Sequence, residues 1–313
     1  MSDRPTNLQI LPRFADGLSY LYVEQARVDR HDLAVAAWDD EGMTPVPCAA
    51  LGLLLLGPGT SITHRAVQTL ADHGCSVVWA GEQGVRFYAS GVGETRHTHL
   101  LEAQARAWAH PRQRLHVARA LYAMRFPGQD VTGLSIAQLR GREGARVRAA
   151  YAAAARETGV TWKGRDYHQS DWFAADPVNR ALSAANSCLY GICHAGIVSL
   201  GCSPGLGFIH TGKALSFVYD LADLYKTETT IPAAFRAAAS KPANLERATR
   251  RICRDLFSSV SLLERVTADL HHLFGSGPQD TERSMDVEPA RPGELWDPEG
   301  HGVEGGQNYG EEA

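Results

Sequence analysis

Short apolar runs rich in β-prone residues dominate the first third of the chain. The run at 51–56 is continuously apolar and is bounded by Gly57, Pro58 and Gly59, which predicts a strand buried on both faces. Residues 39–42 are Asp-Asp-Glu-Gly and predict a turn. We therefore expect strands at 18–24, 33–38, 51–56, 75–80 and 85–89, with one helix at 63–73.

From Leu100 onward the apolar positions follow a helical period, interrupted by Gly- and Pro-containing breaks. The most apolar long stretch, 181–203, contains Asn186, His194 and several Ser and Gly residues. It is too polar to span lipid and predicts a buried helix.

After Phe274 apolar residues become too sparse to offset the entropy of ordering the chain. These patterns predict an α+β fold in three parts. They are a β-rich domain at 1–95, an all-helical domain at 96–275 and an acidic disordered tail at 276–313.

The charge of the chain is unevenly distributed. The net charge is −4, but the tail holds ten acidic and two basic residues, which leaves the rest of the chain at +4. Between Gln104 and Arg165 there are twelve Lys and Arg against three acidic residues. This segment suits a polyanion such as nucleic acid, although a solvated helix surface has the same composition.

The six cysteines contain no CxxC pair, and the N-terminus lacks the apolar stretch of an export signal. We therefore expect a cytoplasmic protein with reduced thiols. Cys188, Cys193, His194 and Cys202 could be read as a zinc site. Their apolar neighbours favour the alternative, in which these cysteines are small core residues.

Two carboxylates lie three residues apart in an otherwise apolar helical segment, 216–226. They are Asp220 and Asp223. A helix that is apolar all round is expected to be buried, and a buried carboxylate requires a partner or a metal ion. The alternative pairs Asp223 with Lys226 and leaves Asp220 as a capping residue.

Glu143 falls on the apolar stripe formed by Leu139, Val147 and Tyr151, so it is expected to point inward. An ion pair with Arg140 or Arg146, each three residues away, is the alternative explanation.

His210 lies in a glycine-rich turn just before the acidic segment, where the backbone can approach a ligand closely. Together with Glu143, Asp220 and Asp223 it supplies a mixed oxygen and imidazole set that suits Mg²⁺ or Mn²⁺. The same turn matches a phosphate-binding loop through Gly207, Gly212 and Lys213. That motif then needs Ser or Thr, and this chain has Ala214, so nucleotide hydrolysis is disfavoured.

Three separated motifs carry a resemblance to a known family. They are Gln-Leu-Arg-Gly-Arg-Glu-Gly at 138–144, Gly-Phe-Ile-His-Thr-Gly-Lys at 207–213 and Ser-Phe-Val-Tyr-Asp-Leu-Ala-Asp at 216–223. Supporting runs lie at 85–91 and 187–191. In this order they resemble the universal CRISPR adaptation integrase, particularly its I-E subtype. The likeness extends from about Leu11 to Phe257 and does not include the tail.

The resemblance implies a β-domain, a helical catalytic domain, a homodimer and a small ferredoxin-like partner subunit. It places the metal ligands at Glu143, His210 and Asp223, with Asp220 as a neighbouring catalytic acid. Positions associated with DNA binding would be Arg86, Tyr167, Trp172, Tyr190, Lys213, Arg247, Arg250 and Arg254. Where related sequences have an arginine after the Gly-Pro-Gly-Thr stretch, this chain has Ser61, and Arg65 is the alternative phosphate contact.

The implied reaction joins a 3′-hydroxyl of spacer-precursor DNA to a phosphodiester of the CRISPR repeat, with a bound cation stabilising the transition state. One phosphodiester replaces another, so ATP is not needed. A structure-specific nuclease that uses water as nucleophile is an alternative for the same residues. A non-catalytic DNA-binding scaffold is the second alternative, in which the acids are only salt-bridged.

Overall fold

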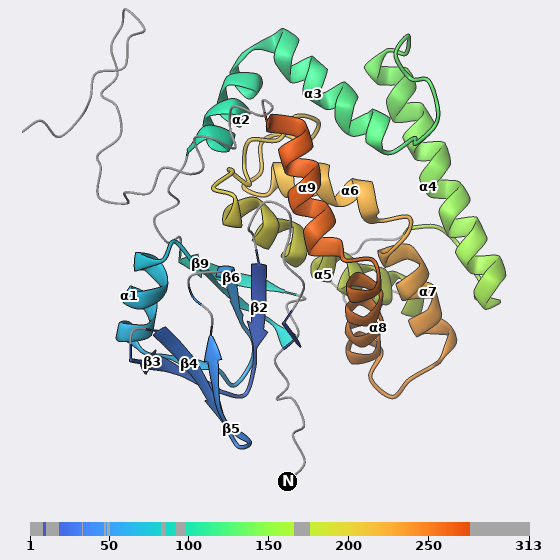
Figure 1. Ribbon diagram of the computed structural model, residues 1–313. Helices are drawn as coiled ribbons and strands as arrows, with labels where there is room; N and C mark the ends of the chain where they lie inside the picture. The colour runs from blue at the N-terminus through green and yellow to red at the C-terminus, as the bar shows by residue number, and fades with distance from the viewer. Residues whose placement is uncertain are drawn as a thin grey trace, which may run out of the picture. The chain divides into compact units, whose positions relative to one another are not determined.

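A computed structural model describes residues 9–10, 19–32, 34–46, 48, 51–82, 86–91, 98–165 and 176–275. Its strands come first along the chain, with one helix among them, and the other described helices follow, which confirms the expected α+β class (Figure 1). The division at residue 95 stays a prediction. The expected disorder of 276–313 lies outside the described residues.

The strands form two sheets within the described part of the chain. The first has the order β1 (Gln9–Ile10), β2 (Ser19–Val23), β6 (Leu51–Leu56), β8 (Ser76–Ala80), β9 (Phe87–Gly91). The second has the order β5 (Gly42–Val46), β4 (Ala34–Asp39), β3 (Arg27–His31), β7 (Ser61–Ile62). Helix α1 (His64–Asp72) contacts β3, β4 and β8.

Strand β6 is buried on both faces, as its apolar run predicts. It pairs in parallel with β2 and β8. Leu53 and Leu55 join the large core cluster of the helices, whereas Leu54 and Leu56 join the core of the β region. Because alternate side chains of a strand point to opposite faces, one continuous run supplies both cores.

The remaining described elements are α2 (His99–Ala109), α3 (Pro111–Met124), α4 (Ile136–Thr158), α5 (Pro177–Ser199), α6 (Ser216–Tyr225), α7 (Thr230–Ala239), α8 (Leu245–Ser259) and α9 (Leu262–Phe274). Helix α4 begins with a capping box between Ser135 and Gln138, and ends at Gly159, whose φ of 68° is left-handed.

Helix α5 is the buried helix expected within 181–203. By length and composition it could span a membrane, but most of it is buried against α6, α7, α8 and α9. Gly191 brings it against the backbone of β9, since a Cβ there would lie 3.0 Å from the backbone of Arg86 and Phe87. At Gly196, a Cβ would lie 2.5 Å from Val266 of α9. Glycine at these two positions therefore permits the close packing of α5.

Candidate functional site

Asp220 is a fully buried carboxylate on α6 that holds the turn before the helix. The backbone N–H groups of Phe208 and Ile209 donate to its Oδ2 at 2.6 and 3.0 Å. The backbone N–H of His210 donates to its Oδ1 at 2.8 Å. A carboxylate that accepts several N–H bonds is well compensated for burial. These N–H groups are therefore not available to cradle a phosphate, in agreement with the failed phosphate-loop match.

The imidazole of His210 is fixed by the same carboxylate. Its Nδ1 lies 2.7 Å from Oδ1 of Asp220, and its side chain is 43% exposed. Because an ionised carboxylate only accepts hydrogen bonds, Nδ1 is the protonated nitrogen in this pairing. The Nε2 lone pair is then available to a ligand.

Glu143 of α4 and Asp223 of α6 face one buried guanidinium. The Nη1 atom of Arg125 lies 3.9 Å from Oε1 of Glu143 and 3.7 Å from Oδ2 of Asp223. Its Nη2 donates to the backbone oxygen of Asp220 at 3.1 Å, and its Nε is buried with no partner among the described residues. Arg125 thus brings two of the predicted metal ligands to one point.

Each of these two carboxylates also has a second cation. Arg146 donates to both oxygens of Glu143 at 3.1 Å, and Lys226 donates to Oδ1 of Asp223 at 2.6 Å. Burial acts to raise the pKa of Asp223, but the charges of Lys226 and Arg125 and the hydrogen bond from Lys226 outweigh it and hold that pKa below its ordinary value. The carboxylate of Asp223 is therefore ionised at neutral pH.

The two ion pairs left open by the sequence, Glu143 with Arg146 and Asp223 with Lys226, are both present. Arg125 was not anticipated. Its only local signal is that it lies in the apolar run Leu121-Tyr122-Ala123-Met124-Arg125-Phe126, where an arginine is expected to need an internal partner.

The donor types of this site fit a hard divalent cation, because they are two carboxylates and an imidazole nitrogen. Across the described ranges, however, no group of three or more His, Cys, Asp or Glu side chains is arranged to hold a metal ion. The three-ligand assignment of Glu143, His210 and Asp223 therefore stays a prediction, and it requires these side chains to approach one another.

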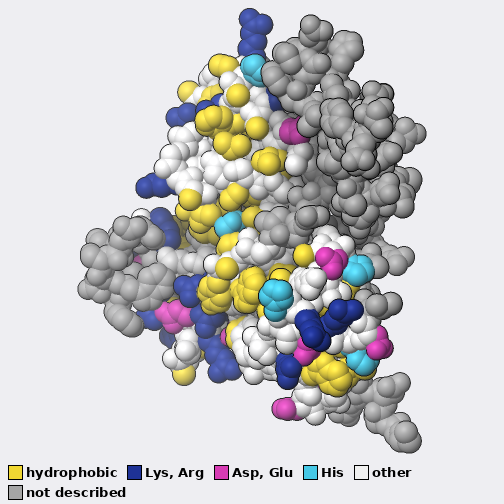
Figure 2. Space-filling view, turned by 90° about the vertical axis from the view of Figure 1, so that its left-hand side faces the viewer, with side chains coloured by type: hydrophobic (Ala, Val, Ile, Leu, Met, Phe, Trp, Pro, Cys, Tyr) yellow, Lys and Arg dark blue, Asp and Glu magenta, His cyan; other side chains and the backbone are white. Residues whose placement is uncertain are grey.

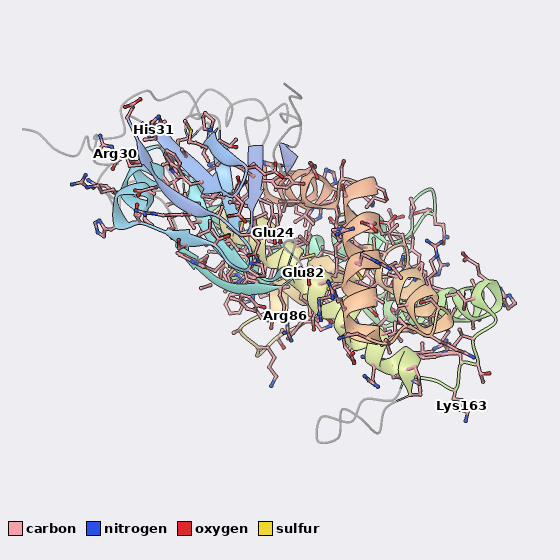
Figure 3. The ribbon with its side chains drawn as sticks, turned by 90° about the horizontal axis from the view of Figure 1, so that it is seen from below. Glu24, Arg30, His31, Glu82, Arg86 and Lys163 are labelled. Atoms are coloured by element: carbon pink, nitrogen blue, oxygen red, sulfur yellow. The ribbon has the colours of Figure 1, made fainter. Side chains whose placement is uncertain are left out.

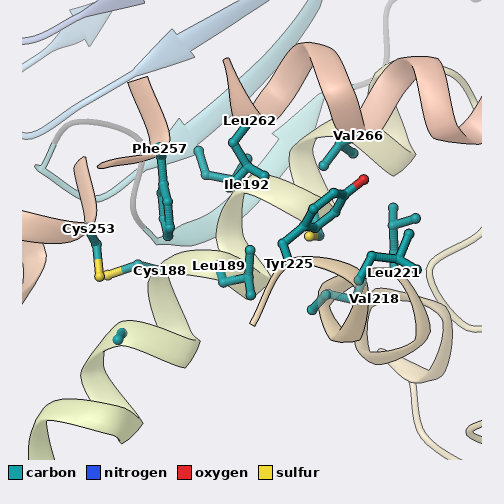
Figure 4. Packing of buried hydrophobic residues seen from close by; sticks show 14 of the residues in the cluster. Cys188, Leu189, Ile192, Val218, Leu221, Tyr225, Cys253, Phe257, Leu262 and Val266 are labelled. Carbon is teal, nitrogen blue, oxygen red and sulfur yellow. The ribbon is translucent and has the colours of Figure 1, made fainter. Parts of the chain in front are cut away.

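The cysteines pack in the core. All six are buried, and Cys188 of α5 faces Cys253 of α8, as Figure 4 shows. Burial raises the pKa of Cys202 to about 12, so this thiol remains protonated. These observations favour the core interpretation of the Cys188, Cys193, His194 and Cys202 group over the zinc site.

Arg247, Arg250 and Arg254 line a pocket of about 410 Å³ at α8. Glu82, Asn244 and Arg251 line the same pocket, and Arg251 is a cation that the sequence reasoning missed. Arg254 also pairs with Asp255 at 2.6 Å. Three of the predicted DNA-binding residues are thus brought together on one surface.

Arg86 lies in the turn between β8 and β9, where the N–H of Gly81 donates to its backbone oxygen at 2.7 Å. Figure 3 shows Arg86 near Glu82, whereas Lys163 lies far from both. On the face seen in Figure 2, Lys and Arg side chains occur in separate groups between apolar ones. The basic surface is therefore discontinuous on that face.

Tyr190 lies beside the acidic site. Its ring is 5.0 Å from that of Tyr219, and Nζ of Lys226 lies 5.3 Å from its centroid. Lys213 is exposed in the turn after His210. Ser61 and Arg65 are also exposed, and Arg65 as the alternative phosphate contact stays a prediction. Tyr167 and Trp172 lie outside the described residues.

Comparison with known proteins identifies the family. The model of the family "CRISPR associated protein Cas1" matches residues 19–132 and 129–253. "CRISPR-associated endonuclease Cas1 2" of Thermus thermophilus is 55% identical over 305 residues, covering 97% of this chain and 94% of the relative. "CRISPR-associated endonuclease Cas1" of Clostridium sp. is 43% identical over 304 residues, covering 96% and 99%.

A solved structure described as "Crystal structure of TtCas1-DNA complex" has 56% identity and a TM-score of 0.79, and it covers 85% of this chain and 100% of its own. The family model and the identities over almost the full length agree. The chain belongs to the family of CRISPR-associated protein Cas1.

Proposed function

We propose that this protein is a metal-dependent DNA integrase of CRISPR adaptation, which joins the 3′-hydroxyl ends of spacer DNA to the repeat array by transesterification. The observation that carries the proposal is the approach of Glu143 and Asp223 to one atom of Arg125. Asp223 lies on the same helix as the Asp220 that fixes His210. The relatives in this family are named endonucleases, which supports an enzyme that acts on phosphodiesters.

The metal ion would be Mg²⁺ or Mn²⁺, held by the carboxylates of Glu143 and Asp223 and by Nε2 of His210. When bound, it supplies a positive charge at the phosphate that undergoes exchange. Asp220 would act on the ion only through His210, because its carboxylate is already occupied by N–H groups.

The protein's own cations set the charge of the site. The carboxylates of Glu143 and Asp223 are neutralised by three nearby cations, Arg125, Arg146 and Lys226. An approaching DNA strand therefore does not meet uncompensated negative charge at the site. The arginines of α8 would contact DNA phosphates, and the similar structure described as a TtCas1-DNA complex supports a nucleic-acid ligand for this chain.

We further propose the finer features implied by the resemblance. The protein would act as a homodimer in the cytoplasm, bind spacer-precursor duplex and CRISPR repeat, and work with the small ferredoxin-like partner subunit. The I-E subtype is part of this proposal, as are Tyr167, Trp172, Tyr190 and Lys213 as DNA contacts.

A nuclease that uses water is the second candidate, and the name endonuclease in the relatives favours it. A non-catalytic scaffold would be consistent with the observed ion pairs of Glu143 and Asp223. The three functions differ in their products: a joined strand, a cut strand, or neither.

The test uses end-labelled donor duplex and a supercoiled plasmid that carries one repeat, with and without the partner subunit. We expect label to become covalently attached to the plasmid in Mn²⁺ or Mg²⁺ without ATP, and not in EDTA. Plasmid cut without transferred label would support the nuclease. Bound DNA that remains unchanged would support the scaffold.

A further inference from the structure

The turn that carries His210 is hydrogen-bonded from two sides. We call residues 203–210 the histidine turn. On one side, Asp220 of α6 accepts from the backbone N–H groups of residues 208–210. On the other side, side chains of α2 and α3 donate to backbone oxygens of residues 203–207. Two separate parts of the helical region therefore hold one partly buried turn.

Gln104 is the buried contact from α2. Its side chain has no exposed surface, and its Nε2 donates to the backbone oxygens of Ser203 at 2.9 Å and Leu206 at 3.4 Å. Its Oε1 accepts from the backbone N–H of Ser203 at 2.8 Å. An amide side chain can donate two hydrogen bonds and accept two. Gln104 directs both of its donors and its acceptor to the histidine turn.

Gly207 receives two further bonds at its backbone oxygen. Nε1 of Trp108 and Nη2 of Arg114 each donate to it at 3.1 Å, and the guanidinium carbon of Arg114 lies 5.2 Å from the Trp108 ring centroid. A Cβ at Gly207 would collide with the backbone oxygen of His210. Because the chain folds back so tightly here, fixing Gly207 also restricts His210.

The histidine turn is thus supported on two sides although the His210 side chain is only partly buried. His210 is 43% exposed and lies on a turn, where an imidazole is expected to adopt several orientations. A metal ligand or reacting group supports the fastest reaction when the residues around it hold it rigidly in the productive geometry. The hydrogen bonds of the turn therefore restrict the position of His210, and they also stabilise the fold.

We propose that Gln104, Trp108 and Arg114 are positioning residues, which hold the histidine turn so that His210 keeps its place and its pairing with Asp220 during the reaction on DNA. This inference rests on the proposed function. It assigns to these three residues of α2 and α3 a role in the site, although the ion pairs of Glu143 and Asp223 are made by other residues, Arg125, Arg146 and Lys226.

The experiment uses Gln104→Met, Arg114→Met and Trp108→Phe in the full-length chain. Trp108→Phe keeps an aromatic ring, smaller than the indole, and removes the Nε1 donor. The matched control is Arg119→Met, because Arg119 is also on α3 but donates to the oxygen of Thr132 at 3.0 Å, away from the histidine turn. Hydrogen exchange of residues 203–210 and single-turnover strand joining at saturating DNA are measured in each variant.

In Gln104→Met we expect the amides of the turn to exchange about tenfold faster than in the parent protein, because local opening becomes easier. The joining rate at saturating DNA should fall about 10- to 100-fold, because small misplacements of a ligand are costly. The DNA concentration for half-maximal rate should change by less than about twofold. Trp108→Phe should show a smaller effect, and Arg119→Met should leave exchange of the turn unchanged.

Unchanged exchange of the turn in Gln104→Met and Arg114→Met would overturn the proposal. So would faster exchange with an unchanged joining rate, or a change confined to the DNA concentration needed, which would identify direct DNA contacts. If the parent protein cuts DNA without joining it, the proposed integrase function fails. The cleavage rate then replaces the joining rate, and the positioning role is tested by the same comparison.

Discussion

The Nη1 atom of Arg125 lies 3.7 Å from Oδ2 of Asp223, and the same atom lies 3.9 Å from Glu143. Arg125 is almost completely buried, so these two carboxylates must compensate the loss of water around its positive charge. Removing one partner from a buried charge network leaves the other charges uncompensated. We expect Arg125→Met to lower the free energy of unfolding by about 3 kcal/mol, the low end for a broken buried ion pair, because both acids keep a second cation.

Urea unfolding measures this change, with Arg119→Met as the control. Arg119 is partly exposed and donates to the Thr132 oxygen, so its loss should change stability by no more than about 1 kcal/mol, the net contribution of one hydrogen bond. Equal stabilities of Arg125→Met and the parent protein would show that the guanidinium is not part of a buried network.

Asp223 and Asp220 should have different effects when replaced with Ala. Asp223→Ala removes a predicted metal ligand and should abolish Mn²⁺-dependent joining while leaving duplex binding largely intact. Asp220→Ala should retain some joining, but it leaves the N–H groups of residues 208–210 without their buried acceptor. Its unfolding free energy should fall by about 1–3 kcal/mol or more.

These two variants are compared by joining rate and by urea unfolding, with Asp220→Asn as the variant that keeps an acceptor oxygen. Near-normal joining by Asp223→Ala would remove Asp223 from the ligand set. An Asp220→Ala protein as stable as the parent would contradict its role in holding the turn.

The arginines of α8 and the β8–β9 turn should contact phosphates. Each lost phosphate contact releases one fewer counterion, so the slope of log affinity against log salt should decrease by about one unit in Arg250→Ala and in Arg86→Ala. Duplex binding measured over a range of salt concentrations gives this slope. If neither variant changes it, these arginines form an ordinary solvated surface.

His194 should make stability depend on pH. Its ring stacks on Phe87 with centroids 3.6 Å apart, and burial lowers its pKa to about 4 from an ordinary 6.5. Between these values the unfolded chain binds a proton that the folded protein does not, so stability falls as pH decreases from about 6.5 to about 4.

His194→Phe keeps an aromatic ring and removes the titration. Its stability should therefore fall less than that of the parent protein across this window, while the difference between the two stays constant from pH 7 to 8. Parallel stability curves at all pH values would show that His194 has the same pKa in the folded protein as in the unfolded chain.

The sequence predicts those features that depend on local periodicity. The continuous apolar run of β6 indicates a buried strand, and the apolar neighbours of Asp220 and Asp223 indicate a buried helix. The structure confirms the burial of β6 and of Asp220. Strand β3 was missed, because within Arg27–His31 only Val28 is buried and the alternation is weak.

Contacts between distant segments were not predictable in the same way. Arg125 precedes the Asp220 oxygen to which it donates by 95 residues, and Gln104 precedes Ser203 by 99. A single sequence carries no signal for such pairs, since each partner alone resembles an ordinary helix residue. The support of the histidine turn could therefore be recognised only from the structure.

The central claim is that the attacking oxygen belongs to the donor DNA rather than to water. Aligned reacting groups behave as though present at very high effective concentration, so a held 3′-hydroxyl should outcompete water. The decisive measurement compares donor duplexes with ordinary and 3′-deoxy ends on the repeat plasmid, in Mg²⁺ or Mn²⁺ with the partner subunit. We predict equal binding of both donors, label joined to the plasmid from the ordinary donor, and no joined product from the 3′-deoxy donor. Plasmid strands cut equally with either donor, without transfer of label, would contradict the account and support the nuclease.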